Sequence, residues 1–156
     1  MKDNSKRICF ISSSGGHFEE LKCLRNIADK YVSVLITEKE EYDITSFCDK
    51  MYLIPKMNRR EVSSYFTLVH SIFLAKKIFK KYKITHLVTT GAMCSYVFCL
   101  VAKMMGIKVI YIESFARTTT PSLTGRLVYP ISDLFIIQWK ALKKYYPKAV
   151  YGGGIF

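Results

Sequence analysis

Short apolar runs alternate with longer stretches of helical periodicity along this 156-residue chain. Runs rich in β-branched residues predict strands, and apolar residues that recur every three or four positions predict helices. The expected strands cover residues 8–12, 32–37, 51–54, 86–90, 108–112 and 134–139, and residues 150–151 lead into a glycine-rich tail. The expected helices cover residues 18–30, 61–82, 94–105 and 140–146.

This alternation predicts a single domain, residues 1–156, of the α/β class. Strands that are apolar throughout are buried on both faces, so helices must cover both sides of the sheet. Right-handed crossovers then give an open, doubly wound, mainly parallel, Rossmann-like sheet. Ligands of such sheets bind beyond the carboxyl ends of the strands, and the loops at those ends are therefore the candidate functional segments.

Charge and composition narrow the classes of partner and compartment. The formal net charge of +12 favours an anionic partner, such as nucleic acid, an acidic membrane face or a diphosphate ligand. The 50% hydrophobic content excludes intrinsic disorder. Five cysteines without a C-x-x-C pair predict free thiols in a reducing cytoplasm. No stretch is apolar for long enough to span a bilayer, and the first residues do not have the pattern of a signal peptide.

The first candidate loop follows the strand at residues 8–12 and comprises Ser13, Ser14, Gly15, Gly16 and His17. Amide groups at a helix N-terminus attract anions, and glycines let a phosphate approach the main chain closely. The alternative, weighted equally, is a tight turn that needs glycine for steric reasons alone. The histidine has the chemistry of a general base, and its position also suits a helix cap.

Two further loops carry polar residues at strand ends. Gly91 lies in the loop at residues 89–93, which leads into a helix. Glu113 directly follows the strand at residues 108–112, with Ser114 and Arg117 after it. A carboxylate, a hydroxyl and a cation in this order suit hydrogen bonds to sugar hydroxyls and phosphate. A solvated connector with no ligand is the equally weighted alternative.

The helix expected at residues 61–82 has an apolar arc wider than packing on a sheet requires. Aromatic and aliphatic side chains next to lysines are typical of a helix at an anionic bilayer interface. The residues expected to contact the membrane are Phe66, Val69, Phe73, Lys76, Lys77, Lys80 and Lys81. The alternative is a core helix whose lysines are solvated near its C-terminus. The histidines have no spacing typical of a metal site, so no bound metal is expected.

The three loops together resemble those of the Alg14-like proteins, the acceptor-side subunits of two-chain glycosyltransferases. The matching segments are S-S-S-G-G-H, T-T-G-A-M and Y-I-E-S-F-A-R. They are also similar to loops in the N-terminal half of MurG-type enzymes. The resemblance implies the N-terminal half of a GT-B glycosyltransferase fold. It also implies that Gly15, Gly16, His17, Gly91 and Glu113 line a site for the diphosphate of the acceptor.

The function implied by this resemblance is that of a non-autonomous subunit in polysaccharide or lipid-linked oligosaccharide synthesis. Such a subunit binds a polyprenyl-diphosphate-linked acceptor at the cytoplasmic face of the plasma membrane and recruits the donor-binding subunit. The UDP-sugar is then expected mainly on that partner, with no cofactor on this chain, and His17 is the candidate base. Two alternatives stay open: a scaffold without an acceptor site, and a self-sufficient enzyme. Nucleic-acid binding is suggested by charge alone, and no nucleic-acid partner is expected, because the sequence has neither an RNP motif nor a zinc-finger spacing.

Overall fold

The computed structural model describes residues 2–40, 45–56 and 63–156, with the backbone alone for residues 63–68. Its centre is a seven-stranded sheet with the order β3-β2-β1-β4-β5-β6-β7. Every neighbouring pair is parallel, which confirms the expected Rossmann-like class. The strands are β1 (Asp3–Ser12), β2 (Tyr31–Glu38), β3 (Lys50–Ile54), β4 (His86–Thr89), β5 (Lys108–Ile112), β6 (Leu134–Ile137) and β7 (Val150–Tyr151).

The strand order reverses between β1 and β4. From β1 the chain moves outward through β2 to β3, then crosses back to β4 and continues outward through β5, β6 and β7. Ile8 lies in register with Ser33 of β2 on one side and with His86 of β4 on the other. A crevice forms where such a sheet changes direction, so the loops after β1 and β4 are positioned for ligand binding.

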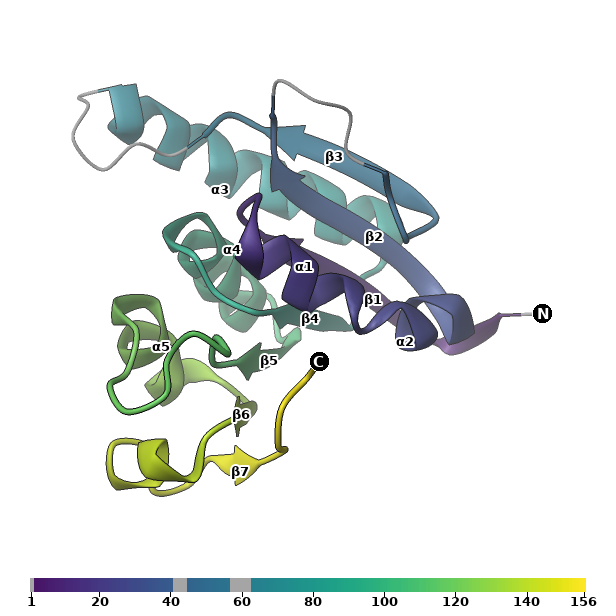
Figure 1. The fold of residues 1–156 in the computed structure, drawn as a ribbon. Coiled ribbons are helices and arrows are strands. Elements are labelled where there is room, and N and C mark those ends of the chain that lie inside the picture. The colour runs from purple at the N-terminus through teal and green to yellow at the C-terminus, as the bar shows by residue number, and fades with distance from the viewer. Residues whose placement is uncertain (1, 41–44, 57–62) are drawn as a thin grey trace.

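One face of the sheet is covered by α3 (Ser63–Tyr82), α4 (Met93–Met104) and α5 (Leu123–Val128) (Figure 1). Phe79 of α3 and Phe98 of α4 meet edge to face, with ring centroids 6.3 Å apart. Both rings belong to a buried cluster that also contains Cys9 and Ile11 of β1. Because alternate residues of a strand face opposite sides, these two β1 positions define the face that carries the larger core.

The opposite face is covered by α1 (Gly16–Lys22) and α2 (Arg25–Lys30) over β1 and β2. Phe18 and Leu21 of α1 pack there with Phe10 of β1. Beyond these helices, an open apolar groove of about 310 Å³ follows the same face across β1, β4, β5 and β6. The aliphatic strand residues that line it are Ile8, Val88, Ile110, Ile112, Leu134 and Ile136.

Three elements differ from the sequence-based expectation. The helix expected at residues 18–30 is two helices, because the amides of Cys23 and Leu24 bond three residues back to Glu20 and Leu21 and so end α1 in a tight turn. The segment around Gly125, which is in none of the expected helices or strands, contains α5, which begins after Ser122 and is capped by its hydroxyl. The helix expected at residues 140–146 is the 3-10 helix η2 (Lys140–Lys144), and a second one, η1 (Tyr129–Ile131), follows α5.

Candidate functional site

The carboxyl ends of β1, β4 and β5 bring the three candidate loops together, because these strands are neighbours in the sheet. The loops enclose a cavity of about 280 Å³. It is lined by His17, Ala92, Ser114, Ala116, Arg117, Ser122, Leu123 and Thr124. Three residues expected to bind the acceptor, His17, Ser114 and Arg117, therefore line one cavity.

His17, in the first turn of α1, is fixed by the second loop. Its Nδ1 lies 3.0 Å from the carbonyl oxygen of Thr90, and the Thr90 hydroxyl donates to the His17 carbonyl at 2.7 Å. A carbonyl oxygen only accepts, so Nδ1 carries a proton. In the neutral ring Nε2 then holds the free lone pair, as a general base requires.

Gly91 gives the histidine ring its space. Its backbone has a φ of 119°, a conformation that L side chains rarely adopt. A Cβ built there would lie 3.2 Å from Cε1 of His17 and 3.0 Å from the Tyr111 hydroxyl. The second loop therefore needs glycine both for its backbone geometry and for close approach to the imidazole.

Glu113 is buried beneath the cavity and is not among its lining residues. One carboxylate oxygen accepts the amide of Ser114 at 3.1 Å, and the other accepts the amide of Ser122 at 3.2 Å and the hydroxyl of Tyr146 at 2.8 Å. The carboxylate thus joins the two ends of the third loop, and its contacts are with its own chain. Burial, followed by the charge of Glu113, raises the pKa of Tyr146, which keeps that hydroxyl a donor.

Gly125 allows this close arrangement. A Cβ at this position would lie 2.6 Å from the Tyr146 hydroxyl and 2.8 Å from Oγ of Ser122, and it would collide with the Glu113 carboxylate. The pattern of the sequence gives no sign of this requirement, because the three contacting residues are distant from one another along the chain.

Glu20, on α1, is a buried residue of this region that the sequence pattern did not reveal. Its carboxylate accepts hydrogen bonds from the third loop and from Gln138, which follows β6. Burial raises the pKa of Glu20, while its hydrogen bonds and the charge of His17 act in the opposite direction. Its position three residues after His17 is the one signal that could have marked it, because residues three apart share a helix face.

The first loop presents glycine backbone to solvent. Gly15 has a φ of 78°, and α1 begins at Gly16 without a side-chain cap. A Cβ at either glycine would meet nothing within 4 Å, so no neighbouring atom explains the choice of glycine. Ser13 and Ser14 are half-buried, and the Ser14 hydroxyl bonds to Glu40. The first amide groups of a helix have no partner inside it. Among the residues that the structure describes, the Phe18 amide donates to the Gly15 carbonyl, and those of Gly16 and His17 have no protein partner and can meet an anion.

The face of α3 that points away from the core exposes Phe73, whose side chain is 66% exposed, together with Val69. The lysines expected beside them, Lys76, Lys77, Lys80 and Lys81, are exposed as well. The side chain of Phe66 lies outside the described residues. Within the described ranges, no helix has both the length and the apolar character needed to cross a membrane.

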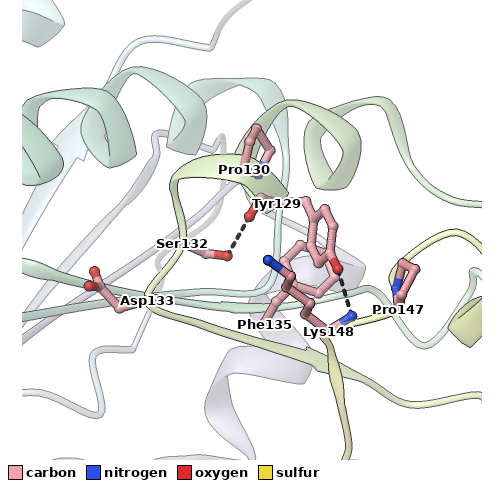
Figure 2. Close-up of a pocket in the computed structure, with 7 residues that line it drawn as sticks. All are labelled: Tyr129, Pro130, Ser132, Asp133, Phe135, Pro147 and Lys148. Atoms are coloured by element: carbon pink, nitrogen blue, oxygen red, sulfur yellow. Dashed lines mark hydrogen bonds between the residues drawn. The ribbon is translucent and has the colours of Figure 1, made fainter.

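A second cavity, of about 540 Å³, lies at the amino end of β6 (Figure 2). Its polar groups bond to one another: Oγ of Ser132 donates to the carbonyl of Tyr129 at 2.9 Å, and the amide of Lys148 donates to the Tyr129 hydroxyl at 2.8 Å. Asp133 accepts the amide of Val109 and pairs with Lys103 and Lys108. The cavity is thus larger than the one beside His17, and the hydroxyls of Tyr129 and Ser132 and the carboxylate of Asp133 already have partners.

Comparisons with known proteins agree with this geometry. The sequence model of the family described as "Oligosaccharide biosynthesis protein Alg14 like" matches residues 8–155. The human protein named "UDP-N-acetylglucosamine transferase subunit ALG14" is 28% identical over 180 residues, covering 97% of this chain and 83% of the human protein. The Yarrowia lipolytica protein of the same name is 27% identical over 164 residues, covering 98% of this chain and 69% of the yeast protein.

Solved structures with a similar fold belong to longer chains. MurG from Acinetobacter baumannii aligns with a TM-score of 0.66 at 14% identity, covering 85% of this chain and 41% of that one. A UDP-N-acetylglucosamine 2-epimerase aligns with a TM-score of 0.71 at 14% identity, covering 92% of this chain and 44% of that one. These likenesses show the fold. Since the family match spans nearly all of the sequence, the chain belongs to the Alg14-like family.

Proposed function

We propose that this protein is a non-autonomous subunit of a two-component glycosyltransferase that makes polysaccharide or lipid-linked oligosaccharide. It binds the polyprenyl-diphosphate-linked acceptor at the cytoplasmic face of the membrane and recruits and activates the subunit that carries the UDP-sugar. Its relatives support the subunit role, because the human and yeast proteins are named subunits of a UDP-N-acetylglucosamine transferase.

The fixed His17 in its cavity is the observation that carries the acceptor role. The acceptor hydroxyl gives its proton to Nε2, and its oxygen forms the new bond to the anomeric carbon of the donor sugar as the bond to UDP breaks. The Nδ1–H bond to the Thr90 carbonyl stabilises the imidazolium that results. Arg117 and the amides of Gly15, Gly16 and His17 bind the acceptor diphosphate.

The charge distribution supports a location at an anionic membrane surface. Between residues 62 and 156 the chain has two acidic residues, Glu113 and Asp133. The first is buried and the second is paired with two lysines, so the basic residues of this part dominate its field. Exposed apolar side chains followed by lysines on α3 suit insertion at the headgroup level with contact to anionic lipids.

A scaffold that recruits the partner without binding the acceptor is the second candidate. The placement of Glu113 favours it, because all contacts of this carboxylate are used to hold the third loop. The two functions differ in what they require of His17. An acceptor subunit needs the imidazole for transfer, whereas a scaffold needs only the surface that the partner contacts.

Reconstitution of the protein with a donor-binding partner, UDP-sugar and a lipid-linked acceptor tests the proposal. We expect no transfer by either chain alone and transfer by the pair. His17→Ala should abolish most of the transfer while the two chains still co-purify. Unaltered turnover by this variant in an intact complex would support the scaffold. Full turnover by the partner without this protein would contradict both functions.

A further inference from the structure

We propose that Glu20 is a positioning residue that holds the third loop at a fixed distance from His17. This inference rests on the proposed function, since it concerns the same cavity. Glu20 is 4% exposed and lies on α1 one turn after His17. Neither the sequence pattern nor the family resemblance assigned a role to it.

The carboxylate of Glu20 connects three segments of the chain. Oε1 accepts the Ser114 hydroxyl at 2.8 Å and the amide of Phe115 at 3.1 Å, both from the third loop. Oε2 accepts Nε2 of Gln138 at 3.3 Å. All three neighbours donate, which is the arrangement that an ionised carboxylate requires. A single side chain of α1 thereby holds the ends of β5 and β6.

The third loop is held from two sides. Glu113 binds its backbone at Ser114 and Ser122, and Glu20 binds its Ser114 hydroxyl and its Phe115 amide. The amide of Arg117 donates to the carbonyl of Ser114 at 2.9 Å, which closes the turn between them. Arg117 is therefore placed in the same cavity as His17 by contacts that lead back, through Glu20, to the same helix.

Stability alone is a poor explanation for a carboxylate at this site. Burying a charge is costly, and an apolar side chain of similar size often replaces a buried ionic group with no loss of stability. The neighbouring buried positions of α1, Phe18 and Leu21, are indeed apolar. What an apolar residue at position 20 would lack is the acceptor for Ser114 and Phe115, and with it the geometry of the loop.

A tryptophan reports on this geometry. Trp139 is the one tryptophan of the sequence. Its Nε1 donates to the carbonyl of Phe115 at 2.7 Å, and its ring lies 5.0 Å from the Phe115 ring. Movement of Phe115 away from Glu20 changes the surroundings of the indole, so the fluorescence of Trp139 follows the loop without any partner or substrate.

The test compares Glu20→Gln with Glu19→Gln. Glu19 is the adjacent acid on α1, exposed and paired with Lys22, which makes it a matched control. In Glu20→Gln the side chain keeps its size but has one acceptor oxygen in place of two, so its NH₂ group must face either the third-loop donors or the Gln138 amide, and one set of bonds is lost. We expect the KM for the lipid-linked acceptor to rise about tenfold, with the KM for the UDP-sugar unchanged, because misplaced binding groups affect the substrate they contact. Trp139 emission should shift in Glu20→Gln and stay unchanged in Glu19→Gln.

An unchanged acceptor KM, accompanied by a lowered melting temperature, would show that Glu20 is only structural and would overturn the proposal. If wild-type pairs transfer no sugar, the proposed function fails on its own. Hydrogen exchange at the Phe115 amide in the isolated chain then decides: faster exchange in Glu20→Gln supports positioning, and equal exchange refutes it. Should Glu20→Gln not fold, Ser114→Ala removes one of the three bonds and should give the same changes at smaller size.

Discussion

The two ends of the sheet each hold a cavity, and the two cavities differ in which of their polar groups have partners within the protein. At the amino end of β6, a cavity of about 540 Å³ is lined by hydroxyls and a carboxylate that bond to the protein backbone or to lysines, and by the side chain of Lys148. At the carboxyl ends of β1, β4 and β5, about 280 Å³ is lined by His17 and Arg117. Within the described part of the chain, Nε2 of His17 and the Arg117 guanidinium have no hydrogen-bond partner.

This difference shows where the fold leaves polar groups available. At the carboxyl end, the buried carboxylates of Glu20 and Glu113 bind the lining residues Ser114 and Ser122, and Nε2 of His17 and the Arg117 guanidinium stay open to a ligand. At the amino end, the carboxylate that binds the backbone belongs to Asp133, which itself lines the cavity and accepts the Val109 amide. The candidate site is therefore identified by polar side chains without a protein partner, held in place by hydrogen-bonded neighbours, and cavity volume is a poorer guide.

The largest expected effect is on the rate of sugar transfer, and it should occur for a variant in one cavity and not for a variant in the other. His17→Ala should lower transfer by the reconstituted pair by about 10² to 10⁴-fold, the usual contribution of a general base. Ser132→Ala, in the other cavity, should leave transfer unchanged. The measurement is initial rate with saturating lipid-linked acceptor. Equal losses in both variants would remove the distinction between the two ends.

A second experiment asks which surface outside both cavities meets the membrane. Lys76→Gln with Lys80→Gln on α3 should weaken binding to vesicles that contain anionic phospholipid by about thirtyfold, at about 1 kcal/mol per lysine. The matched control is Lys140→Gln with Lys144→Gln, which removes the same charge near β7. Co-sedimentation with anionic and with neutral vesicles measures both. If the two double variants lose binding equally, net charge alone attracts the protein, and α3 has no special part.

A third experiment tests how tightly the residues around the Glu113 carboxylate are packed. Gly125→Ala places a methyl group against Tyr146, Ser122 and Glu113, and should lower the free energy of unfolding by about 1–3 kcal/mol, as overpacked sites do. Gly16→Ala, where nothing lies within 4 Å, should change it by less than about 0.5 kcal/mol. Urea denaturation compares the two. A harmless Gly125→Ala would mean that the residues around Glu113 are packed more loosely than their contacts indicate.

The smallest expected effect is a difference in how stability depends on pH, between Glu20 near the carboxyl ends of the strands and Asp133 at the amino end of β6. Burial raises the pKa of Glu20 above its usual 4.5. The stabilisation linked to its protonated form is therefore complete below pH 4.5 and is lost as pH rises through the raised pKa. The pKa of Asp133 shifts in the opposite direction: burial acts to raise it, but the Val109 amide and two lysines lower it below 3.8. The contribution of the ionised Asp133 to the free energy of unfolding is therefore present above pH 3.8 and is lost as pH falls through the lowered pKa.

Urea unfolding across this range should therefore show two slopes of opposite sign, each at most about 1.4 kcal/mol per pH unit. Glu20→Gln should remove the loss of stability on the alkaline side, and Asp133→Asn should remove the loss on the acid side. The same slopes in wild type and both variants would show that neither carboxyl is perturbed.

Sequence pattern predicted the parts of the fold that depend on local periodicity. The strands at residues 8–12 and 108–112 are mostly apolar on both faces, and together with the helices between the strands this predicts the parallel sheet. The break at Cys23 has no glycine or proline to announce it, and α5 was missed because Pro121 and Gly125 are typical of irregular loops. Local signals are weak where tertiary packing decides the backbone.

For the candidate site too, the sequence predicted some features and could not predict others. Its location at the strand ends, and the presence of His17 and Arg117 in one cavity, were predictable because neighbouring parallel strands end together. The buried position of Glu113 and the role of Glu20 depend on contacts with Tyr146 and Gln138, which are far along the chain. No pattern within a loop contains that information.

The apolar groove beside α1 and α2 has a practical consequence. Leu134 is exposed there, Ile110 and Ile136 are half-buried, and Ile8, Val88 and Ile112 form the buried floor, so the groove is an apolar patch of the kind that drives proteins to associate. We expect the isolated chain to precipitate or self-associate as its concentration rises, and more so at high salt, where mutual repulsion of its surplus positive charge is screened. Dilute, low-salt buffers are therefore the conditions to choose when it is purified.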